Sequence, residues 1–268
     1  MKVGVLMSEK KRAVLSARGT FASTRNLEFS MIDESGDLKI QCEGLDLLLT
    51  KVSDFSNAKI TNFLETTEIK QFVSLENQKL VTDRLDTFLR LHGVVRMAHT
   101  ETYRDDYQLF PVMVKSRLAC GPASSHRMGI ANDSASLSRI VAELPGELVL
   151  QEYIPHDGCL FKVFGIGTDF FVFLRPSLPV GAIPRDSFDS QVYFKSLPKL
   201  HVDPSAEDVA LLSEMGRRIG LETQLKLFGF DAVKDGNGSL VVVDVNYFPS
   251  YGEVADFPRL LESLILTR

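Results

Sequence analysis

Apolar and polar positions alternate in short blocks along the first part of the chain. Three apolar runs have the length of β-strands: Val3–Met7, Leu27–Ile32 and Leu45–Leu49. After the first run, Ser8 can cap a helix over Lys11–Ala17, which Gly19 would end. Strand, helix and strand in close succession predict a small α/β lobe over residues 1–74.

Apolar residues at helical spacing follow in Leu75–Leu91, and Gly93 would end that helix. Beyond it, the apolar pattern predicts two strands and a helix: Phe110–Val114, Leu148–Ile154 and Ser134–Ala142. The polar stretch 120–126 has too few apolar residues for a regular element and predicts a loop. These elements form a predicted central lobe over residues 75–178.

The last part of the chain predicts a lobe over residues 179–268. Ala206–Arg218 is a strong amphipathic helix that Gly220 would end, and Phe257–Leu266 is a closing helix. Between them, two apolar runs flank Asn237-Gly238, the residue pair that favours a two-residue hairpin loop. This part of the chain therefore combines helices with a hairpin.

The hairpin brings two acidic residues together. A loop of Asn237-Gly238 would set Asp231 directly opposite Asp244, with Asn246 on the same face because side chains alternate along a strand. A four-residue loop, Asp235–Gly238, would shift the pairing by two and leave the acids diagonal on one face. Either register keeps the two carboxylates close.

Two facing carboxylates repel each other, so their pairing on apolar strands implies a cation between them. Carboxylate and amide oxygens suit a hard ion such as Mg²⁺, which also keeps waters and binds substrate phosphates. The alternative is a hairpin whose acids point into solvent. Val241, Val243 and Val245 argue against it, because an apolar strand of this kind is normally covered.

A second hairpin is predicted over residues 160–174, turning near Gly167. With a two-residue loop that starts at Gly167 or at Thr168, Lys162 and Arg175 share one face of the sheet. A bulge or a three-residue loop would separate them.

Composition limits the class of protein. The chain has 268 residues, 44% apolar and 24% charged, as in ordinary soluble proteins. A net charge of −5 argues against nucleic-acid and membrane binding. The chain has three cysteines without metal-ligand spacing, no signal-peptide core and no run of membrane-spanning length, so we expect a cytoplasmic protein. We also expect a monomer.

Phosphate chemistry is suggested by single cations rather than by a glycine-rich loop. The chain has no Walker A motif, no GxGxxG and none of the protein-kinase signatures. Five cations stand near predicted strands: Lys11, Lys51, Lys115, Lys162 and Arg175. Each alone is most often a solvated side chain, but five that converge on a carboxylate-bound metal would form an anion cleft.

Short motifs also follow one another in order along nearly the full length. They are Ser8-Glu9-Lys10-Lys11, Thr50-Lys51-Val52-Ser53-Asp54, Lys115-Ser116-Arg117, Gln151–His156, Arg175-Pro176-Ser177-Leu178, Leu227–Asp231 and Asp244-Val245-Asn246-Tyr247-Phe248-Pro249. Together they resemble the inositol 1,3,4-trisphosphate 5/6-kinases (inositol tris/tetrakisphosphate kinases). The resemblance implies an α/β (α+β) ATP-grasp fold of three lobes, with ATP between the middle and C-terminal lobes.

The resemblance also implies how ATP binds. Main-chain groups of Glu152, Tyr153 and Ile154, next to Gln151, would read the adenine. Lys115 would contact the phosphates, helped by two hydroxyl side chains, Ser177 and Ser190. The family's Asn-Arg pair in the helix after the first lobe corresponds to Asn77-Gln78, so the ATP contact of that arginine is either lost or moved to Lys79.

For the second substrate and the metal, the resemblance implies a cationic cleft beside the acid pair. Asp231, Asp244 and Asn246 would hold Mg²⁺. The phosphates of an inositol ring would be held by Lys11, Lys51, His126, Lys162, Arg175 and Asn246. Lys162 and Asn246 would act in catalysis, which is in-line transfer of the γ-phosphoryl group to a ring hydroxyl.

Two other classes of protein share part of this pattern. An ATP-grasp carboxylate–amine ligase has the same fold and a metal site, but such ligases usually carry Glu-x-Asn where this chain has Asp244-x-Asn246. A non-catalytic inositol phosphate-binding protein would lack Asp231, Asp244 or Lys115, and all three are present. The sequence therefore favours the kinase.

Overall fold

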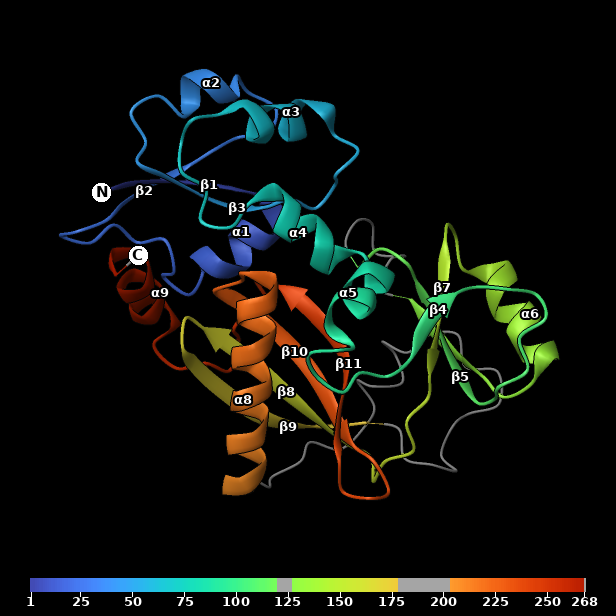
Figure 1. The fold of residues 1–268 in the computed structure, drawn as a ribbon. Helices are drawn as coiled ribbons and strands as arrows, with labels where there is room; N and C mark the ends of the chain where they lie inside the picture. Colours follow the sequence, from blue (N-terminus) through green and yellow to red (C-terminus); the bar gives the residue numbers. More distant parts are fainter. Residues whose placement is uncertain (120–126, 178–202, 268) are drawn as a thin grey trace.

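The computed structural model describes residues 1–119, 127–177 and 203–267 of the chain. Within these residues the strands form three sheets (Figure 1). A small parallel sheet lies at the top of the view, and two four-stranded sheets lie below and beside it. This is a mixed α/β architecture, as the sequence predicts.

The first sheet is parallel, and its strands run in the order β2-β1-β3. Its strands are β1 (Lys2–Met7), β2 (Glu28–Met31) and β3 (Leu47–Lys51). The central strand β1 is buried on both faces beyond its first residue, as expected of a parallel sheet with helices on both sides. The helices α1 (Glu9–Ser16), α2 (Leu38–Gln41) and α3 (Ala58–Thr66) complete this lobe. The three predicted strands and the first helix are confirmed.

The prediction of a single helix over Leu75–Leu91 is wrong, because the structure has two helices in this stretch. α4 (Leu75–Thr82) ends at Asp83, whose backbone is extended (φ −86°, ψ 116°), and α5 (Arg84–Leu91) begins directly after it. The Asp83 carboxylate accepts hydrogen bonds from the first N–H groups of α5, and its backbone forms a β-bridge with Leu118. A helix cap therefore sits inside a continuous apolar pattern.

The second sheet is antiparallel in the order β4-β7-β5-β6. It contains β4 (Thr100–Thr102), β5 (Val112–Ser116), β6 (Met128–Ala131) and β7 (Leu148–Glu152). The helix α6 (Ser134–Glu143) packs against β6 and β5. The sequence placed two of these strands and the helix within two residues of their bounds, but it did not predict β4 and β6, which are only three and four residues long.

The third sheet has the order β11-β10-β8-β9, again antiparallel. Its strands are β8 (Cys159–Ile166), β9 (Asp169–Pro176), β10 (Leu227–Lys234) and β11 (Leu240–Tyr247). Because β8 and β9 pair with the C-terminal strands, this sheet begins at Cys159, and the expected division between residues 178 and 179 does not separate the two sheets.

Figure 1 shows α8 (Ala206–Thr223) lying across the third sheet, where it packs against β8 and β9, and α9 (Phe257–Leu266) packs against β8. α9 has its predicted bounds. α8 continues past Gly220, where a side chain would come within 3.2 Å of both the Leu225 carbonyl oxygen and the Phe228 ring, and it ends at Gln224 in a left-handed conformation. Gly220 therefore serves close packing rather than helix termination.

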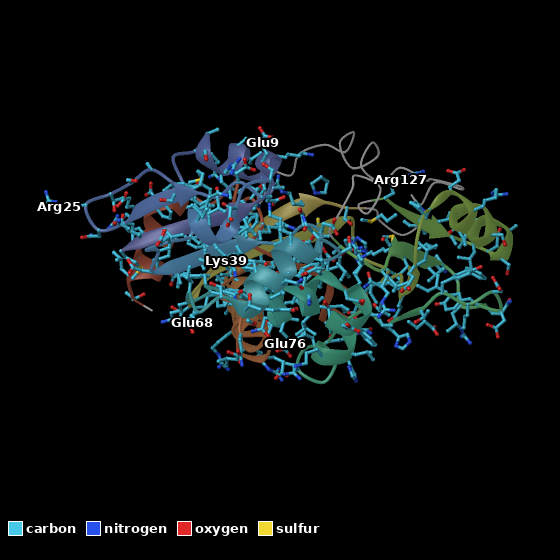
Figure 2. All side chains as sticks on the ribbon, turned by 90° about the horizontal axis from the view of Figure 1, so that it is seen from above. Glu9, Arg25, Lys39, Glu68, Glu76 and Arg127 are labelled. Atoms are coloured by element: carbon cyan, nitrogen blue, oxygen red, sulfur yellow. The ribbon has the colours of Figure 1, made fainter. Side chains whose placement is uncertain are left out.

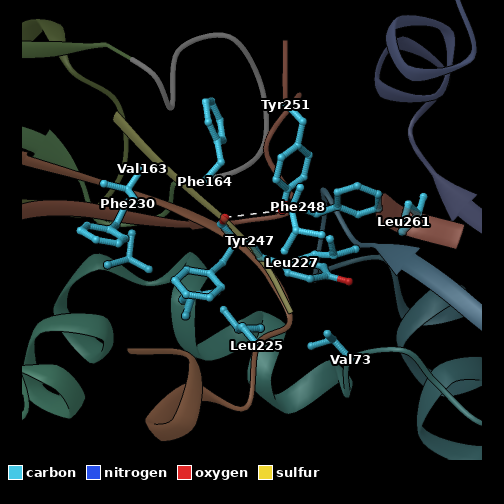
Figure 3. Close-up of a cluster of buried hydrophobic side chains, with 14 of the residues drawn as sticks. Val73, Val163, Phe164, Leu225, Leu227, Phe230, Tyr247, Phe248, Tyr251 and Leu261 are labelled. Carbon is cyan, nitrogen blue, oxygen red and sulfur yellow. Dashed lines mark hydrogen bonds between the residues drawn. The ribbon is translucent and has the colours of Figure 1, made fainter. Parts of the chain in front are cut away.

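A large apolar core joins the first and third sheets. It includes Val3 and Val5 of β1 together with Phe228 and Phe230 of β10. Figure 3 shows how Tyr247, Phe248 and Tyr251, which follow one another at the end of β11, point into this cluster beside Phe164 and Leu261. The chain after β11 is thus anchored in the core.

Seen from above, the molecule is elongated (Figure 2). Arg25 marks the end formed by the first sheet, and Arg127 marks the second sheet at the other end. In the part of the chain that the structure describes, no helix combines the length and the apolar composition needed to cross a membrane.

Candidate active site

A cavity of about 550 Å³ lies between the second and third sheets. The chain segment 97–100 connects these two sheets beside the cavity. Met97 forms a β-bridge with Val242 of β11, and Thr100 pairs with Gln151 of β7. The cavity lining combines cations, acids and apolar groups: Arg84, Met113, Lys115, Met128, Gln151, Glu152, Tyr153, Ile154, His156, Leu160, Lys162, Arg175, Pro176, Ser177, Asp231, Val233, Val243 and Asp244.

The acid pair faces this cavity. Asp231 lies directly opposite Asp244 across β10 and β11, and Gly229 lies opposite Asn246 two residues on. The side chains of Asp231 and Asp244 are 20% and 26% exposed, so they do not project into solvent. The predicted juxtaposition of the two carboxylates is confirmed.

The turn that produces this register differs from both predicted loops. Near the turn Lys234 pairs with Leu240, and Asp235 forms a backbone hydrogen bond with Ser239 across a three-residue loop that ends with Gly238 at φ 79°. A shift of register between Asp231 and Ala232, a β-bulge, then restores the pairing. The bulge cancels the extra loop residue and returns the two acids to opposed positions.

The second hairpin has the first of the two predicted loops, Gly167-Thr168, with Gly167 at φ 63°. Its register pairs Leu160 with Arg175 and Lys162 with Phe173, so Lys162 and Arg175 share one face. On that face Lys162 also lies opposite Asp231 of β10. The sheet therefore places two cations beside the acid pair.

Two cations pair with the two acids. The Nζ of Lys162 lies 2.6 Å from Asp231 Oδ1, and the Nε of Arg84 lies 3.7 Å from Asp244 Oδ1. Burial raises the pKa of Asp231, and the facing Asp244 charge adds to this although Lys162 opposes it. Burial disfavours the charged form of Lys162, but the charge and the hydrogen bond of Asp231 outweigh burial and raise the Lys162 pKa.

Lys115, near the end of β5, is almost completely buried. Its Nζ donates hydrogen bonds to Gln151 Oε1 (2.7 Å) and to the Val243 carbonyl oxygen (3.1 Å), so it crosses from the second sheet to the third. Burial lowers its pKa to about 8, although the charge of Asp244 opposes that shift. A bound anion would therefore find a cation that has few competing contacts with water.

The strand β7 brings the segment Glu152–Ile154 to one end of the cavity. There His156 shares hydrogen bonds with the Ile154 carbonyl oxygen (2.7 Å) and with Ser177 Oγ (2.8 Å). The imidazole thus joins the segment after β7 to the end of β9. The surroundings, which include Met113, are mainly apolar and fit a flat heterocycle.

At the opposite end of the acid-bearing face, the first lobe contributes two lysines. The Nζ of Lys51 donates to the carbonyl oxygens of Tyr247 (2.7 Å) and Phe248 (2.9 Å), and the Nζ of Lys11 lies 5.5 Å from the centre of the Phe248 ring. Burial, with a smaller contribution from the Lys51 charge, lowers the pKa of Lys11 to about 6. The two lysines therefore meet just beyond Asn246.

Most of the residues singled out in the sequence come together. Ten of them line the cavity: Lys115, Gln151, Glu152, Tyr153, Ile154, Lys162, Arg175, Ser177, Asp231 and Asp244. Asn246 shares the face of the acid pair, and Lys11 and Lys51 lie at its far end. His126 and Ser190 lie outside the described residues.

Sequence reasoning did not single out Arg84, which lines the cavity. Gln78 is buried in the first lobe, where its side chain bonds Thr50, and Lys79 is exposed and pairs with Glu65. Arg84 instead lines the cavity, with its side chain 11% exposed. The signal was the Asp83-Arg84 pair at a helix start, which the single-helix interpretation of this stretch concealed.

The acid pair fits a magnesium ion. Asp231 and Asp244 offer oxygen donors, burial and the facing Asp244 charge raise the pKa of Asp231, and Asn246 adds an amide on the same face. Among the described residues there is no cluster of three or more His, Cys, Asp or Glu side chains that could hold a metal. Two carboxylates suit an ion that completes its shell with waters and phosphates.

Comparison with solved structures shows the ATP-grasp fold. The D-alanine–D-alanine ligase of Bacillus anthracis, solved with ATP, superposes with a TM-score of 0.70 over 100% of this chain and 96% of that chain, at 15% sequence identity. An ATP-grasp RimK domain protein of Sphaerobacter thermophilus superposes with a TM-score of 0.62 at 15% identity, over 99% of this chain and 100% of that chain. At these identities the likeness concerns the fold alone.

Sequence comparison is more specific. Inositol-tetrakisphosphate 1-kinase 6 of Oryza sativa is 33% identical over 161 residues, which cover 55% of this chain and 29% of the relative. Inositol-tetrakisphosphate 1-kinase 3 of Arabidopsis thaliana is 30% identical over 174 residues, 59% of this chain and 47% of the relative. The match thus spans less than half of these relatives.

A family model extends the match over the second and third sheets. The model described as the inositol 1,3,4-trisphosphate 5/6-kinase ATP-grasp domain matches residues 95–267, which contain Lys115, Lys162, Asp231 and Asp244. The match covers more than half of the chain and includes the acid pair and most of the cavity lining. The chain therefore belongs to the inositol 1,3,4-trisphosphate 5/6-kinase family and has its ATP-grasp domain.

Proposed function

We propose that this protein is an Mg²⁺- and ATP-dependent inositol polyphosphate kinase, which transfers the γ-phosphoryl group of ATP to a hydroxyl of an inositol tris- or tetrakisphosphate. The observation that carries the proposal is the acid pair Asp231 and Asp244, set at the meeting point of two kinds of surface. One is the largely apolar pocket beside Glu152–Ile154, and the other is a face with several cations. The names of the relatives support the substrate class.

In this proposal ATP lies between the second and third sheets. Its adenine occupies the apolar end of the cavity, against the main chain of Glu152–Ile154 and near His156. Its phosphates extend toward Lys115 and Arg84, two cations of low exposure. Buried cations form strong charge-assisted hydrogen bonds with phosphate oxygens because little water competes.

The inositol polyphosphate lies on the other side of the acid pair. Lys162 of the third sheet and Lys11 and Lys51 of the first lobe hold its phosphates, and Arg175, on the same face as Lys162, faces the inositol ring. A ring hydroxyl then attacks the γ-phosphorus in line, forms the new O–P bond and loses its proton, while the bond to the bridging oxygen of ADP breaks. The chain contributes by positioning the two substrates and by placing positive charge around the transferring group.

Asp231, Asp244 and Asn246 are the residues that would hold Mg²⁺. The bound ion would neutralise charge on the β- and γ-phosphates and so assist the transfer. Lys162, which pairs with Asp231, would then be available to the phosphates.

The proposal is tested by measuring Mg²⁺-dependent ATP consumption with inositol tris-, tetrakis-, pentakis- and hexakisphosphates. Amino acids and small carboxylic acids with amines form the contrast set, because solved proteins of similar fold include ligases. Turnover with an inositol phosphate supports the kinase, and turnover confined to a carboxylate and amine pair overturns it. Binding of inositol phosphates without any turnover would indicate a non-catalytic binding protein.

Replacement of Lys162 by alanine is expected to weaken inositol phosphate binding by about tenfold or more and ATP binding much less. The reason is that Lys162 lies on the polyphosphate side of Asp231 and shares a face with Arg175. Both affinities are measured by calorimetry in saturating Mg²⁺, so that Asp231 keeps a cationic partner. Lys234→Ala is the matched control, since Lys234 pairs with Asp208 outside the cavity. Equal losses for both ligands would assign Lys162 to the nucleotide instead.

Lys11 gives polyphosphate binding a pH dependence. With a pKa of about 6, Lys11 is mostly neutral at pH 7.5, whereas a bound phosphate favours its ammonium form. Binding should therefore take up a proton, and affinity should fall as pH rises above about 6, by up to about tenfold per pH unit.

Calorimetry at pH 7.5 in buffers of different ionisation enthalpy measures this proton uptake. The substrate's own phosphates titrate in the same range, so the relevant quantity is the difference between the unmodified chain and Lys11→Met. We expect the variant to take up close to one proton less. Equal uptake by the two proteins would remove Lys11 from the polyphosphate site.

A further inference from the structure

One cation of the cavity, Arg175, forms an ion pair with an acid that does not belong to the metal site. Arg175, near the end of β9, forms an ion pair with Glu253, which lies in the segment between β11 and α9. By contrast, Lys162 and Arg84 pair with Asp231 and Asp244, the acids that a metal ion would neutralise. Glu253 therefore places a negative charge at the edge of the cationic face that is proposed to bind the polyphosphate.

The segment that carries Glu253 is held in place without this ion pair. Arg18 donates to the carbonyl oxygens of Ser250 (2.9 Å), Tyr251 (2.7 Å) and Val254 (3.4 Å). The Tyr251 ring stacks on Phe257 at 4.2 Å within the buried core. The Arg175 and Glu253 side chains are 43% and 32% exposed, and ion pairs of this exposure contribute little to stability. The Arg175–Glu253 ion pair is therefore not needed to hold this segment in place.

The pair lies on the substrate side of the acid pair. Arg175 is opposite Leu160, one step along the sheet face from Lys162, and its charge disfavours protonation of Lys162. A phosphate that binds Arg175 would lie beside the Glu253 carboxylate, which pairs with the same guanidinium. A hydroxyl can accept a hydrogen bond from Arg175 and donate one to Glu253 at the same time. The pair therefore matches a hydroxyl better than a phosphate.

We propose that Glu253 is a specificity-determining residue, which makes the Arg175 end of the site select a ring hydroxyl over a ring phosphate. The chain then favours less phosphorylated inositol phosphates over fully phosphorylated ones. This inference rests on the proposed function and refines its substrate class. Its physical basis is that a fixed carboxylate repels a phosphate dianion held by the same arginine.

The test compares the unmodified chain with Glu253→Gln, which keeps the shape of the side chain and removes its charge. Affinities for an inositol trisphosphate, inositol hexakisphosphate and ATP are measured by calorimetry. We expect the affinity for hexakisphosphate to rise about tenfold relative to that for trisphosphate, since two charges a few ångströms apart at the surface interact by that order. ATP affinity should be unchanged. Glu253→Ala should give the same shift if the glutamine variant folds poorly.

Glu214→Gln is the matched control, because Glu214 also forms an ion pair with an arginine, Arg217, but on the exposed surface of α8. It should leave all three affinities unchanged. An unaltered ratio of hexakis- to trisphosphate affinity in folded Glu253 variants overturns the inference and leaves the kinase proposal standing. If no inositol phosphate binds the unmodified chain or the variants, both are overturned.

Discussion

Asp244→Asn is expected to reduce kinase turnover by about 10³-fold or more while the fold stays intact. Asp244 faces Asp231 across the hairpin, and the two carboxylates are the charged oxygen donors that the third sheet presents to the cavity. An amide in place of one carboxylate keeps the shape but removes half of the negative charge that would attract the ion. The variant should therefore need much more Mg²⁺ for any residual activity, which a magnesium titration of the rate measures.

The thermal unfolding midpoint of the same variant, measured without Mg²⁺, separates chemistry from folding. Loss of one of two facing like charges removes a repulsion, which offsets the loss of the Arg84–Asp244 ion pair, so the midpoint should change little. Asp169→Asn serves as the control, because Asp169 is an exposed acid at the start of β9, on the same sheet but outside the cavity. Turnover near that of the unmodified chain in Asp244→Asn would remove the metal assignment.

Lys115→Met should weaken ATP binding by about 10²-fold, with inositol phosphate binding changed far less. Lys115 is 6% exposed and donates to both Gln151 and Val243, so in the proposed complex it is a buried cation at the nucleotide phosphates. Its removal also leaves two buried acceptors without this donor, and we expect the free energy of unfolding to fall by about 1–3 kcal/mol. Calorimetry and denaturant unfolding measure the two effects separately.

Lys79→Met is the informative control for this variant. The resemblance in sequence pointed to Lys79 as an ATP contact, whereas the structure places it on the surface beside Glu65. We expect its ATP affinity to equal that of the unmodified chain. A loss of ATP affinity in Lys79→Met, or its absence in Lys115→Met, would contradict the placement of the nucleotide between the second and third sheets.

The sequence located the acid pair correctly but not the way in which the chain forms it. Asn237-Gly238 favours a two-residue loop, yet Asp235 accepts hydrogen bonds from the N–H groups of Asn237 and Ser239 and stabilises a wider turn. A bulge farther along the strand then compensates for the extra residue. Local turn preference was overridden by side-chain capping, while the alternation of side chains still set which residues share a face.

Other features depended on contacts between distant residues. No local pattern shows that Glu253 meets Arg175, or that Lys51 reaches the Phe248 carbonyl oxygen, because these pairs form only when three sheets assemble. The break between α4 and α5 at Asp83 was not predicted for a different reason. The apolar spacing continues across it, and the sequence marks the start of α5 only by the capping carboxylate of Asp83. Short elements such as β4 carry too few residues for a periodic pattern.

The most direct test of the kinase assignment follows the phosphoryl group itself. The protein is incubated with Mg²⁺, ATP labelled in its γ-phosphate and an inositol tris- or tetrakisphosphate, and the products are separated by ion exchange. We predict that the label appears in an inositol phosphate with one more phosphate than the substrate. Label found solely in inorganic phosphate, released only when a carboxylic acid and an amine are supplied, would contradict the assignment and make the protein a ligase.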